Sequence, residues 1–217
     1  YNRLKYNFAS DRPSYITLQW SDPLGSSAND YDLFIFNAAG TTLLAVSNTR
    51  QNGSQLPLEL LICSSATCPV DAVVVVAKFA GAPRALRLGT TGHVTNGAGP
   101  SLLTYSTNGT YGHNAAASAI TVAAVDVATA MNNGGVFIGG ATNPVEYFSS
   151  DGPRRMFYNP NGTAITPGNV LFSTGGGTTL QKVDLAAADG VRTSTPIHST
   201  FFGTSAAAPH AAAIAAL

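Results

Sequence analysis

Charged residues are scarce in this 217-residue chain. Asp, Glu, Lys and Arg make up 10% of the residues, whereas an average globular domain contains about 25%. The 11 basic residues balance the 11 acidic ones, so the formal net charge is zero. The sequence contains neither a basic patch of the kind that binds nucleic acid nor an acidic run typical of a charged tail. We therefore expect no nucleic-acid partner.

Long hydrophobic runs are also missing. Runs such as residues 71–77 are far shorter than the roughly 20 apolar residues that a membrane-spanning helix needs, and no signal-peptide pattern is present. We therefore expect no membrane partner. Because the sequence starts at Tyr1 rather than Met and stops at Leu217 within an apolar run, we expect it to continue on both sides. Its low charge and 22 glycines favour a secreted or cell-envelope protein.

Cysteine is limited to Cys63 and Cys68, which are separated by small polar residues. In an oxidising compartment this pair can close a small loop as a disulfide, and the alternative is two reduced thiols. A zinc site is disfavoured because no second Cys or His pair has ligand spacing.

Residues 1–100 have the pattern of a β-rich domain. Short runs of alternating or β-branched and aromatic residues are separated by polar or glycine-containing turns, which is typical of an antiparallel β-sandwich. The stretch at 89–100 is rich in Gly and Thr and is interpreted as a linker. The expected strands are 15–20, 31–36, 42–47, 58–63, 71–79 and 85–88.

Residues 101–217 have a different character. Buried strands are expected at 120–125 and 146–150, and a long glycine-rich loop at 159–179. The alanine-rich segment 204–217 predicts a helix. Because this helix is apolar almost all round, we expect it to be central and buried.

The segment 202–213 has the features of an activated serine. Ser205 follows Gly203, which permits a tight approach to the start of a helix. Unpaired N–H groups at a helix N-terminus can stabilise a developing oxyanion. Pro209 has no N–H to offer the Ser205 carbonyl, so it loosens the first turn. These features predict that Ser205 is a catalytic nucleophile.

Gly203-Thr-Ser205, the small residues that follow and Pro209-His210 resemble the serine motif of the subtilisin-like serine proteases. Three upstream segments, in family order, look like a strand ending in Val-Asp, a Phe-Ser-Ser-x-Gly-Pro turn and a Lys-Pro-Asp segment, the last with Val183 and Ala188 where proline is usual. They lie at 119–126, 147–153 and 182–190.

The resemblance covers about residues 112–217. It implies the C-terminal part of an α/β subtilisin-like core at 101–217. It also implies a serine endopeptidase that acts on protein or peptide substrates through an acyl-enzyme on Ser205 and requires no cofactor.

Residues 1–100 resemble a β-sandwich that some bacterial members of this family insert, mainly in Trp20-Ser-Asp-Pro and Asp30-Tyr-Asp-Leu33. The Asp-[Ser/Thr]-Gly, His-Gly-Thr and Ala-Gly-Asn strings that supply the family's catalytic Asp, His and oxyanion Asn do not occur in the sequence. The resemblance therefore implies that these residues precede Tyr1, in a missing N-terminal part of the same catalytic domain. The present chain alone is then expected to be nearly inactive.

None of the remaining titratable groups is a strong substitute for the missing catalytic residues. His210 lies five positions after Ser205 on one helix and so points to another face. We interpret the other histidines and two aspartates at family positions as structural; they are His93, His113, His198, Asp184 and Asp189.

Asp22, Asp30 and Asp32 are close together in sequence and suggest structural calcium, although aspartate is also common in turns. The competing function is a non-catalytic binding or accessory module. In that reading the sandwich recognises protein or carbohydrate and residues 101–217 are a pseudoprotease remnant. The residues before Tyr1 in the parent gene discriminate the two.

Overall fold

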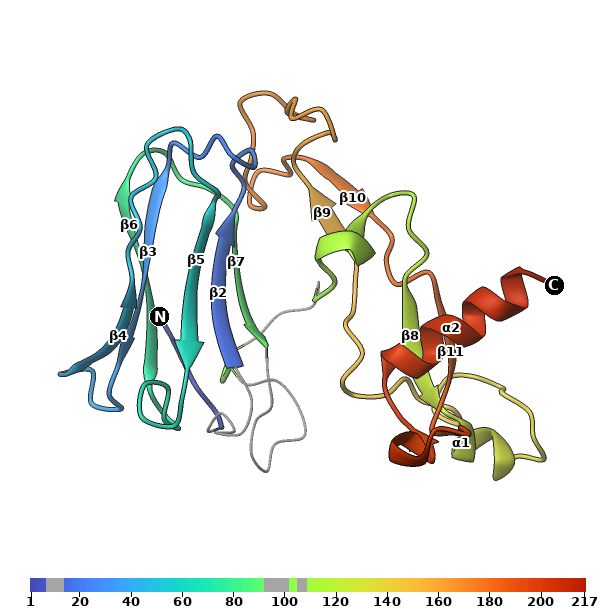
Figure 1. Ribbon diagram of the computed structural model, residues 1–217. Helices are drawn as coiled ribbons and strands as arrows, with labels where there is room; N and C mark the ends of the chain where they lie inside the picture. The colour runs from blue at the N-terminus through green and yellow to red at the C-terminus, as the bar shows by residue number, and fades with distance from the viewer. Residues whose placement is uncertain (7–13, 92–101, 105–108) are drawn as a thin grey trace. The chain divides into compact units, whose positions relative to one another are not determined.

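The computed structural model describes residues 1–6, 14–91, 102–104 and 109–217, and its regular structure is mostly antiparallel β-sheet with few helices (Figure 1). The chain divides into two compact units. The sandwich unit contains residues 1–105 and 156–178, and the helix unit contains residues 106–155 and 179–217. Residues 156–178 thus group with the sandwich, although the sequence analysis placed them in the second domain.

Two antiparallel sheets form the sandwich unit. One has the order β1-β6-β3-β4 and the other β5-β2-β7. This part is therefore an all-β antiparallel sandwich, as its alternating sequence predicted. The strands are β1 (Asn2–Arg3), β2 (Ser14–Trp20), β3 (Asp30–Phe36), β4 (Leu43–Ser47), β5 (Leu58–Cys63), β6 (Val73–Ala80) and β7 (Leu86–Thr91).

Side chains from both sheets build one hydrophobic core. Alternate residues of β2 and of β3 point inward because successive side chains of a strand face opposite sides. The Trp20 and Tyr31 rings lie 5.3 Å apart between centroids. A disulfide joins Cys63 to Cys68, so the structure has the disulfide rather than two reduced thiols. The inward-facing side chains of β2 and β3 are Ile16, Leu18, Trp20, Tyr31, Leu33 and Ile35.

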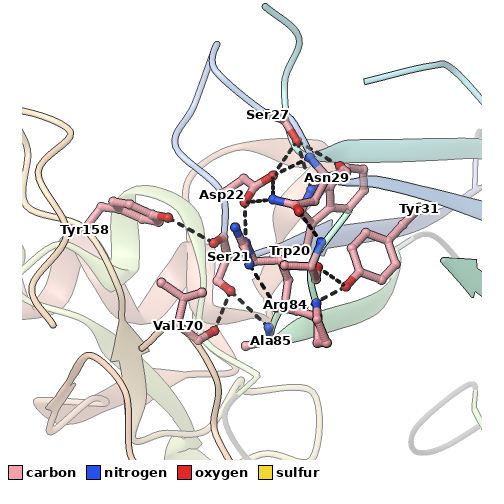
Figure 2. Close-up of polar contacts among 12 residues, drawn as sticks. Trp20, Ser21, Asp22, Ser27, Asn29, Tyr31, Arg84, Ala85, Tyr158 and Val170 are labelled. Atoms are coloured by element: carbon pink, nitrogen blue, oxygen red, sulfur yellow. Dashed lines mark hydrogen bonds and ion pairs between the residues drawn. The ribbon is translucent and has the colours of Figure 1, made fainter. Parts of the chain in front are cut away.

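A buried polar network surrounds Asp22 at the end of β2 (Figure 2). Its carboxylate accepts hydrogen bonds from Ser27 Oγ at 2.9 Å and Asn29 Nδ2 at 2.8 Å, and it pairs with Arg84 Nε at 2.5 Å. Ser27 Oγ also accepts from Trp20 Nε1 at 2.9 Å. The network satisfies polar atoms that would otherwise be costly to bury.

The segment 156–178 is hydrogen-bonded to the sandwich next to this network. Ser21 Oγ donates to the Val170 carbonyl at 2.6 Å, and Ala85 N–H donates to the same carbonyl at 3.2 Å. Tyr158 Oη donates to the Ser21 carbonyl at 3.2 Å (Figure 2). These bonds explain why a segment distant in sequence belongs to the sandwich unit.

In the helix unit, β8 (Val122–Asp126) and β11 (Leu185–Asp189) pair in parallel, and helix α2 (Thr204–Ala215) packs against both strands. The other elements are the 3-10 helices η1 (Gly112–Ala115) and η2 (Pro196–His198), helix α1 (Val127–Met131), the antiparallel pair β12 (Val191–Arg192) and β13 (Thr200–Phe201), and the pair β9 (Arg154–Met156) and β10 (Thr178–Leu180).

Two sequence predictions for this unit are wrong. Residues 146–150 are not a strand but a turn closed by the Ser149 N–H to Glu146 carbonyl bond of 2.9 Å. This turn covers the edge of β8, because Ala124 accepts from Glu146 N–H at 2.8 Å and donates to Ser149 Oγ at 3.0 Å.

The second wrong prediction is the burial of α2. Among its residues only Ala206 and Ala207 are buried, and Ile214 is 72% exposed. The reason is geometric: β8 and β11 cover one face near the start of the helix, and its later turns extend beyond them (Figure 1).

In the part of the chain that the structure describes, no helix is long and apolar enough to cross a bilayer.

The Asp22 network generates a stability prediction. Burial raises the pKa of Asp22, but hydrogen bonds from Asn29, Arg84 and Ser27 outweigh it and lower the pKa below the ordinary value of 3.8. A depressed carboxylate pKa contributes stability above the unfolded-state value, and this contribution is lost as the pH falls through the folded-state value. We expect Asp22→Asn to cost roughly 2–4 kcal/mol of unfolding free energy at pH 7, because it leaves Arg84 without its counter-charge.

Urea unfolding at pH 7 and pH 3 measures this loss. The difference between the D22N variant and the native chain should shrink as the pH is lowered from 7 to 3, because the stability contributed by a carboxylate with a lowered pKa is lost as the pH falls toward and through its folded-state value. Asp71→Asn is the matched control, because Asp71 is exposed on the same unit and should change stability by less than about 0.5 kcal/mol. Equal losses in D22N and D71N would show that the network does not stabilise the sandwich.

Candidate functional site

Ser205 is the second residue of α2, and its side chain is exposed rather than packed. The N–H groups of Ala206 and Ala207 both donate to the Gly203 carbonyl, at 2.8 and 3.2 Å. The N–H groups of Thr204 and Ser205 have no acceptor among the described residues. A hydroxyl and two free amide donors therefore stand at the positive end of a helix dipole, which suits an anionic oxygen.

A buried carboxylate fixes the residue that precedes this helix. Gly203 has φ 111°, in the region that glycine tolerates best. Its N–H donates to Asp189 Oδ2 at 2.7 Å, and Asp189 is fully buried at the end of β11. The other oxygen, Oδ1, has no hydrogen-bond partner among the described residues. Asp189 thus links the carboxyl end of β11 to the start of α2. This link agrees with the interpretation of Asp189 as structural.

Gly190 makes this close approach possible. It has φ +64°, and a Cβ there would lie 2.6 Å from Asp126 Oδ1 and 2.9 Å from Phe202 Cε1. Both distances are shorter than any ordinary carbon contact, so only glycine fits without a shift. The sequence did not reveal the hydrogen bond between Gly203 and Asp189, although the neighbouring residues Asp189 and Gly190 were a signal for a close approach at this position.

The last two residues of the motif, Pro209 and His210, lie inside α2. Pro209 lies inside α2 and cannot donate to the Ser205 carbonyl. His210 Nδ1 bonds the Ala206 carbonyl at 2.7 Å. Because a carbonyl only accepts, Nδ1 carries the hydrogen and is unavailable as a base. This bond agrees with the interpretation of His210 as structural.

The other histidines and Asp184 do not join Ser205. His113 lies in η1 and His198 in η2, where its ring centroid is 5.0 Å from that of Phe201. His93 lies outside the described residues. Among the described residues, Ser205 Oγ makes no hydrogen bond to a histidine or carboxylate.

Asp184 is instead hydrogen-bonded to Thr121, the residue before β8. Its carboxylate accepts from Lys182 Nζ and from Thr121 N–H, both at 2.7 Å. The Lys182 hydrogen bond, with that from Thr121, lowers the pKa of Asp184.

Three carboxylates gather at the carboxyl ends of β8 and β11. Asp126 and Asp189 are paired in register, and Asp126 Oδ1 accepts from Ala128 N–H at 2.9 Å, which caps α1. Burial, and then the charges of Asp189 and Asp126, raise the pKa of Glu146. The sequence analysis missed Glu146 because it placed this residue in a strand.

The structure does not bring together the three aspartates suggested for calcium. Asp22 is engaged with Arg84, Asn29 and Ser27, whereas Asp30 and Asp32 line a hollow to which Asp22 does not contribute. Within the described ranges, no group of three or more His, Cys, Asp or Glu side chains has a metal-binding arrangement.

A second hollow, of about 390 Å³, lies in the helix unit. Its lining is mostly apolar and includes Phe137, Ile138 and Val145 together with the β11 alanines. Ser205 lines neither hollow, so substrate contacts of the candidate nucleophile are not defined by an enclosed pocket.

Comparisons of this chain with protein-family models, curated proteins and solved structures find no match. The subtilisin-like assignment therefore stays a prediction from the motifs at 119–126, 147–153, 182–190 and 203–210.

Glu146 provides a test of the electrostatics beside β11. A raised carboxylate pKa means that ionisation disfavours the folded state at pH values above that pKa. We expect Glu146→Gln to raise the unfolding free energy at pH 8 by less than about 1 kcal/mol, since solvent screens a half-exposed group, and to have no such effect at pH 4. Asp184→Asn is the opposite-sign control, because the pKa of Asp184 is lowered. Thermal unfolding at both pH values decides; an E146Q variant less stable than the native chain at pH 8 would contradict this.

Proposed function

We propose that this chain is the C-terminal part of a subtilisin-like serine endopeptidase with Ser205 as its nucleophile. The observation that carries the proposal is the exposed Ser205 side chain beside two unpaired amide donors at the start of α2. The Gly203-Thr-Ser205 and Pro209-His210 motif supports it, and so does the parallel pair β8–β11 against which α2 packs.

In the proposed reaction, Ser205 Oγ attacks the scissile carbonyl carbon while a histidine base takes the hydroxyl proton. The carbonyl oxygen becomes an oxyanion, and the Ser205 N–H donates to it. Collapse breaks the C–N bond, the histidine returns its proton to the leaving amine, and the acyl group stays on Ser205. Water then releases the acid by the reverse sequence. Asp189 contributes by holding Gly203, and hence the first turn of α2, in place.

The histidine, its aspartate and the oxyanion asparagine belong, in this proposal, to an N-terminal part of the same catalytic domain. That part would cover the exposed face of α2 and lie against the free groups at its start. The sandwich is then an insertion into the protease domain. Protein or peptide substrates and a secreted or cell-envelope location follow from the same assignment, and the Cys63–Cys68 disulfide is compatible with an extracellular site.

Active-site labelling tests the nucleophile. We expect the full-length product of the parent gene to react with a fluorophosphonate probe at Ser205, and Ser205→Ala to abolish both labelling and peptide hydrolysis. In subtilisin, loss of the catalytic serine or histidine lowers turnover by about 2 × 10⁶. The 217-residue chain alone should therefore label at a negligible rate. Mass spectrometry of the labelled peptide measures both.

Thr204→Ser is the control, because it leaves the hydroxyl at 205 and the backbone donors intact and should keep labelling within a fewfold of the native rate. Stoichiometric labelling of the isolated chain would contradict the need for an upstream base. Labelling of the full-length protein that persists in the S205A variant would overturn the proposed nucleophile.

A non-catalytic binding module is the second candidate, favoured by the lack of a histidine or carboxylate bonded to Ser205 among the described residues. A full-length protein that neither labels nor cleaves peptides, and lacks His-Gly-Thr and Ala-Gly-Asn strings before Tyr1, would select it.

A further inference from the structure

Four of the five residues that line a small hollow on the sandwich unit have polar side chains. Its volume is about 180 Å³, and its lining residues are Asp30, Asp32, Asn48, Arg50 and Phe79. The aspartates come from β3, Phe79 from β6, and the other two from the segment after β4. Ligand pockets for drug-sized molecules span roughly 300–1,000 Å³, so this hollow suits a single small ring.

Strand geometry places these side chains together. Asp30 and Asp32 are alternate residues of β3 and therefore face the same side of its sheet. The pairing of β3 with β6 shifts register between Asp30 and Tyr31, whose partners are Ala80 and Lys78. Phe79, which lies between those partners, is the extra residue of this bulge. A bulge re-aims a side chain, and Phe79 is 68% exposed.

The polar side chains of the hollow have few partners among the described residues. Asp30 is only 3% exposed, yet its Oδ1 accepts no hydrogen bond from any described residue. The side chains of Asp32, Asn48 and Arg50 likewise make no hydrogen bond or ion pair within the described ranges. A buried acceptor without a donor is costly, so a ligand that donates a hydrogen bond to Asp30 Oδ1 would remove this cost. Burial, and then the charges of Asp30 and Glu59, raise the pKa of Asp32.

The mixture of charges selects the ligand class. A free cation would be attracted by the two aspartates but would lie beside the Arg50 guanidinium. An anion would be attracted by Arg50 but repelled by both aspartates. A divalent metal is disfavoured because no three metal-binding side chains come together in the described part of the chain. A neutral molecule with many hydroxyls avoids all three conflicts, because each hydroxyl both donates and accepts.

We propose that the hollow formed by Asp30, Asp32, Asn48, Arg50 and Phe79 binds one neutral pyranose ring of a carbohydrate. Hydroxyls donate to Asp30 Oδ1 and to the Asp32 carboxylate and accept from Arg50 and Asn48. The C–H face of the ring lies on exposed Phe79. The site is on the sandwich unit and does not depend on catalysis by Ser205.

Isothermal titration of the 217-residue chain with the methyl glycosides of glucose, galactose and mannose tests the site. We expect at least one to bind with a dissociation constant of about 1 mM, as suits a small shallow site. Asp32→Asn and Phe79→Ala should each weaken that binding at least tenfold. Asp30→Asn should also weaken it, and D32N keeps the test valid if D30N fails to fold.

Two matched controls separate the site from general effects. Ile62→Ala removes an apolar side chain that is also 68% exposed on the sandwich, and Asp71→Asn removes an exposed carboxylate outside the hollow. Both should bind as the native chain does. Three results would each overturn the proposal. The first is no saturable binding up to about 50 mM, where a millimolar site is filled. The second is binding by D32N and F79A as tight as that of the native chain, and the third is binding of Ca²⁺ or Nα-acetyl-lysine methyl ester that D32N abolishes while no pyranoside binds.

Discussion

Each sheet of this protein must bury one apolar face, and the two units meet that constraint to different degrees. In the sandwich, β2 and β5 on one sheet face β3 and β6 on the other, and their alternating side chains fill a single core. In the helix unit a two-stranded parallel sheet has only α2 against it, and α2 buries only Ala206 and Ala207. Parallel sheets in α/β proteins are covered on both faces. The apolar sequence of α2 predicts burial on all sides, but only the two strands β8 and β11 pack against it. Most of the helix surface is therefore exposed.

Two buried aspartates illustrate how differently this chain treats a carboxylate. Asp22 has donors for both oxygens, and its pKa is lowered despite burial. Asp189 uses one oxygen to hold Gly203 and leaves the other without a donor among the described residues. A satisfied carboxylate in a core stabilises the fold, whereas a half-satisfied one is costly unless something further binds it. The oxygen that Asp189 does use accepts from Gly203 N–H, two residues before the proposed nucleophile Ser205.

The sequence predicted the sandwich strands well because their information is local. Alternation in residues 15–20 and 31–36 specifies which side chains turn inward, and the strands found at 14–20 and 30–36 differ by one residue. Residues 146–150 misled the prediction because Tyr147 and Phe148 are strand formers, yet the turn is fixed by the edge of β8, which is far away in sequence. The position of Ser205 followed from its motif, but the hydrogen bond from Gly203 N–H to Asp189 did not, since the antiparallel pair β12–β13 brings those two residues together. The hollow beside Asp30 likewise depends on a register shift that no local pattern specifies.

The proposed reaction has two separate requirements, which are stabilisation of the oxyanion and activation of the Ser205 hydroxyl. The start of α2 can stabilise an anion with its own amides, and the hydrogen bond from Gly203 N–H to Asp189 holds that start against β11. Activation of the hydroxyl is a separate requirement, because a serine at neutral pH needs a base within hydrogen-bond reach. His210 cannot meet it with Nδ1, which is engaged with the Ala206 carbonyl. A serine that has amide donors for the oxyanion but no base for its hydroxyl proton is unreactive until the base is brought to it. Under the proposed function, cleavage would thus depend on docking of the catalytic domain's two parts rather than on either part alone.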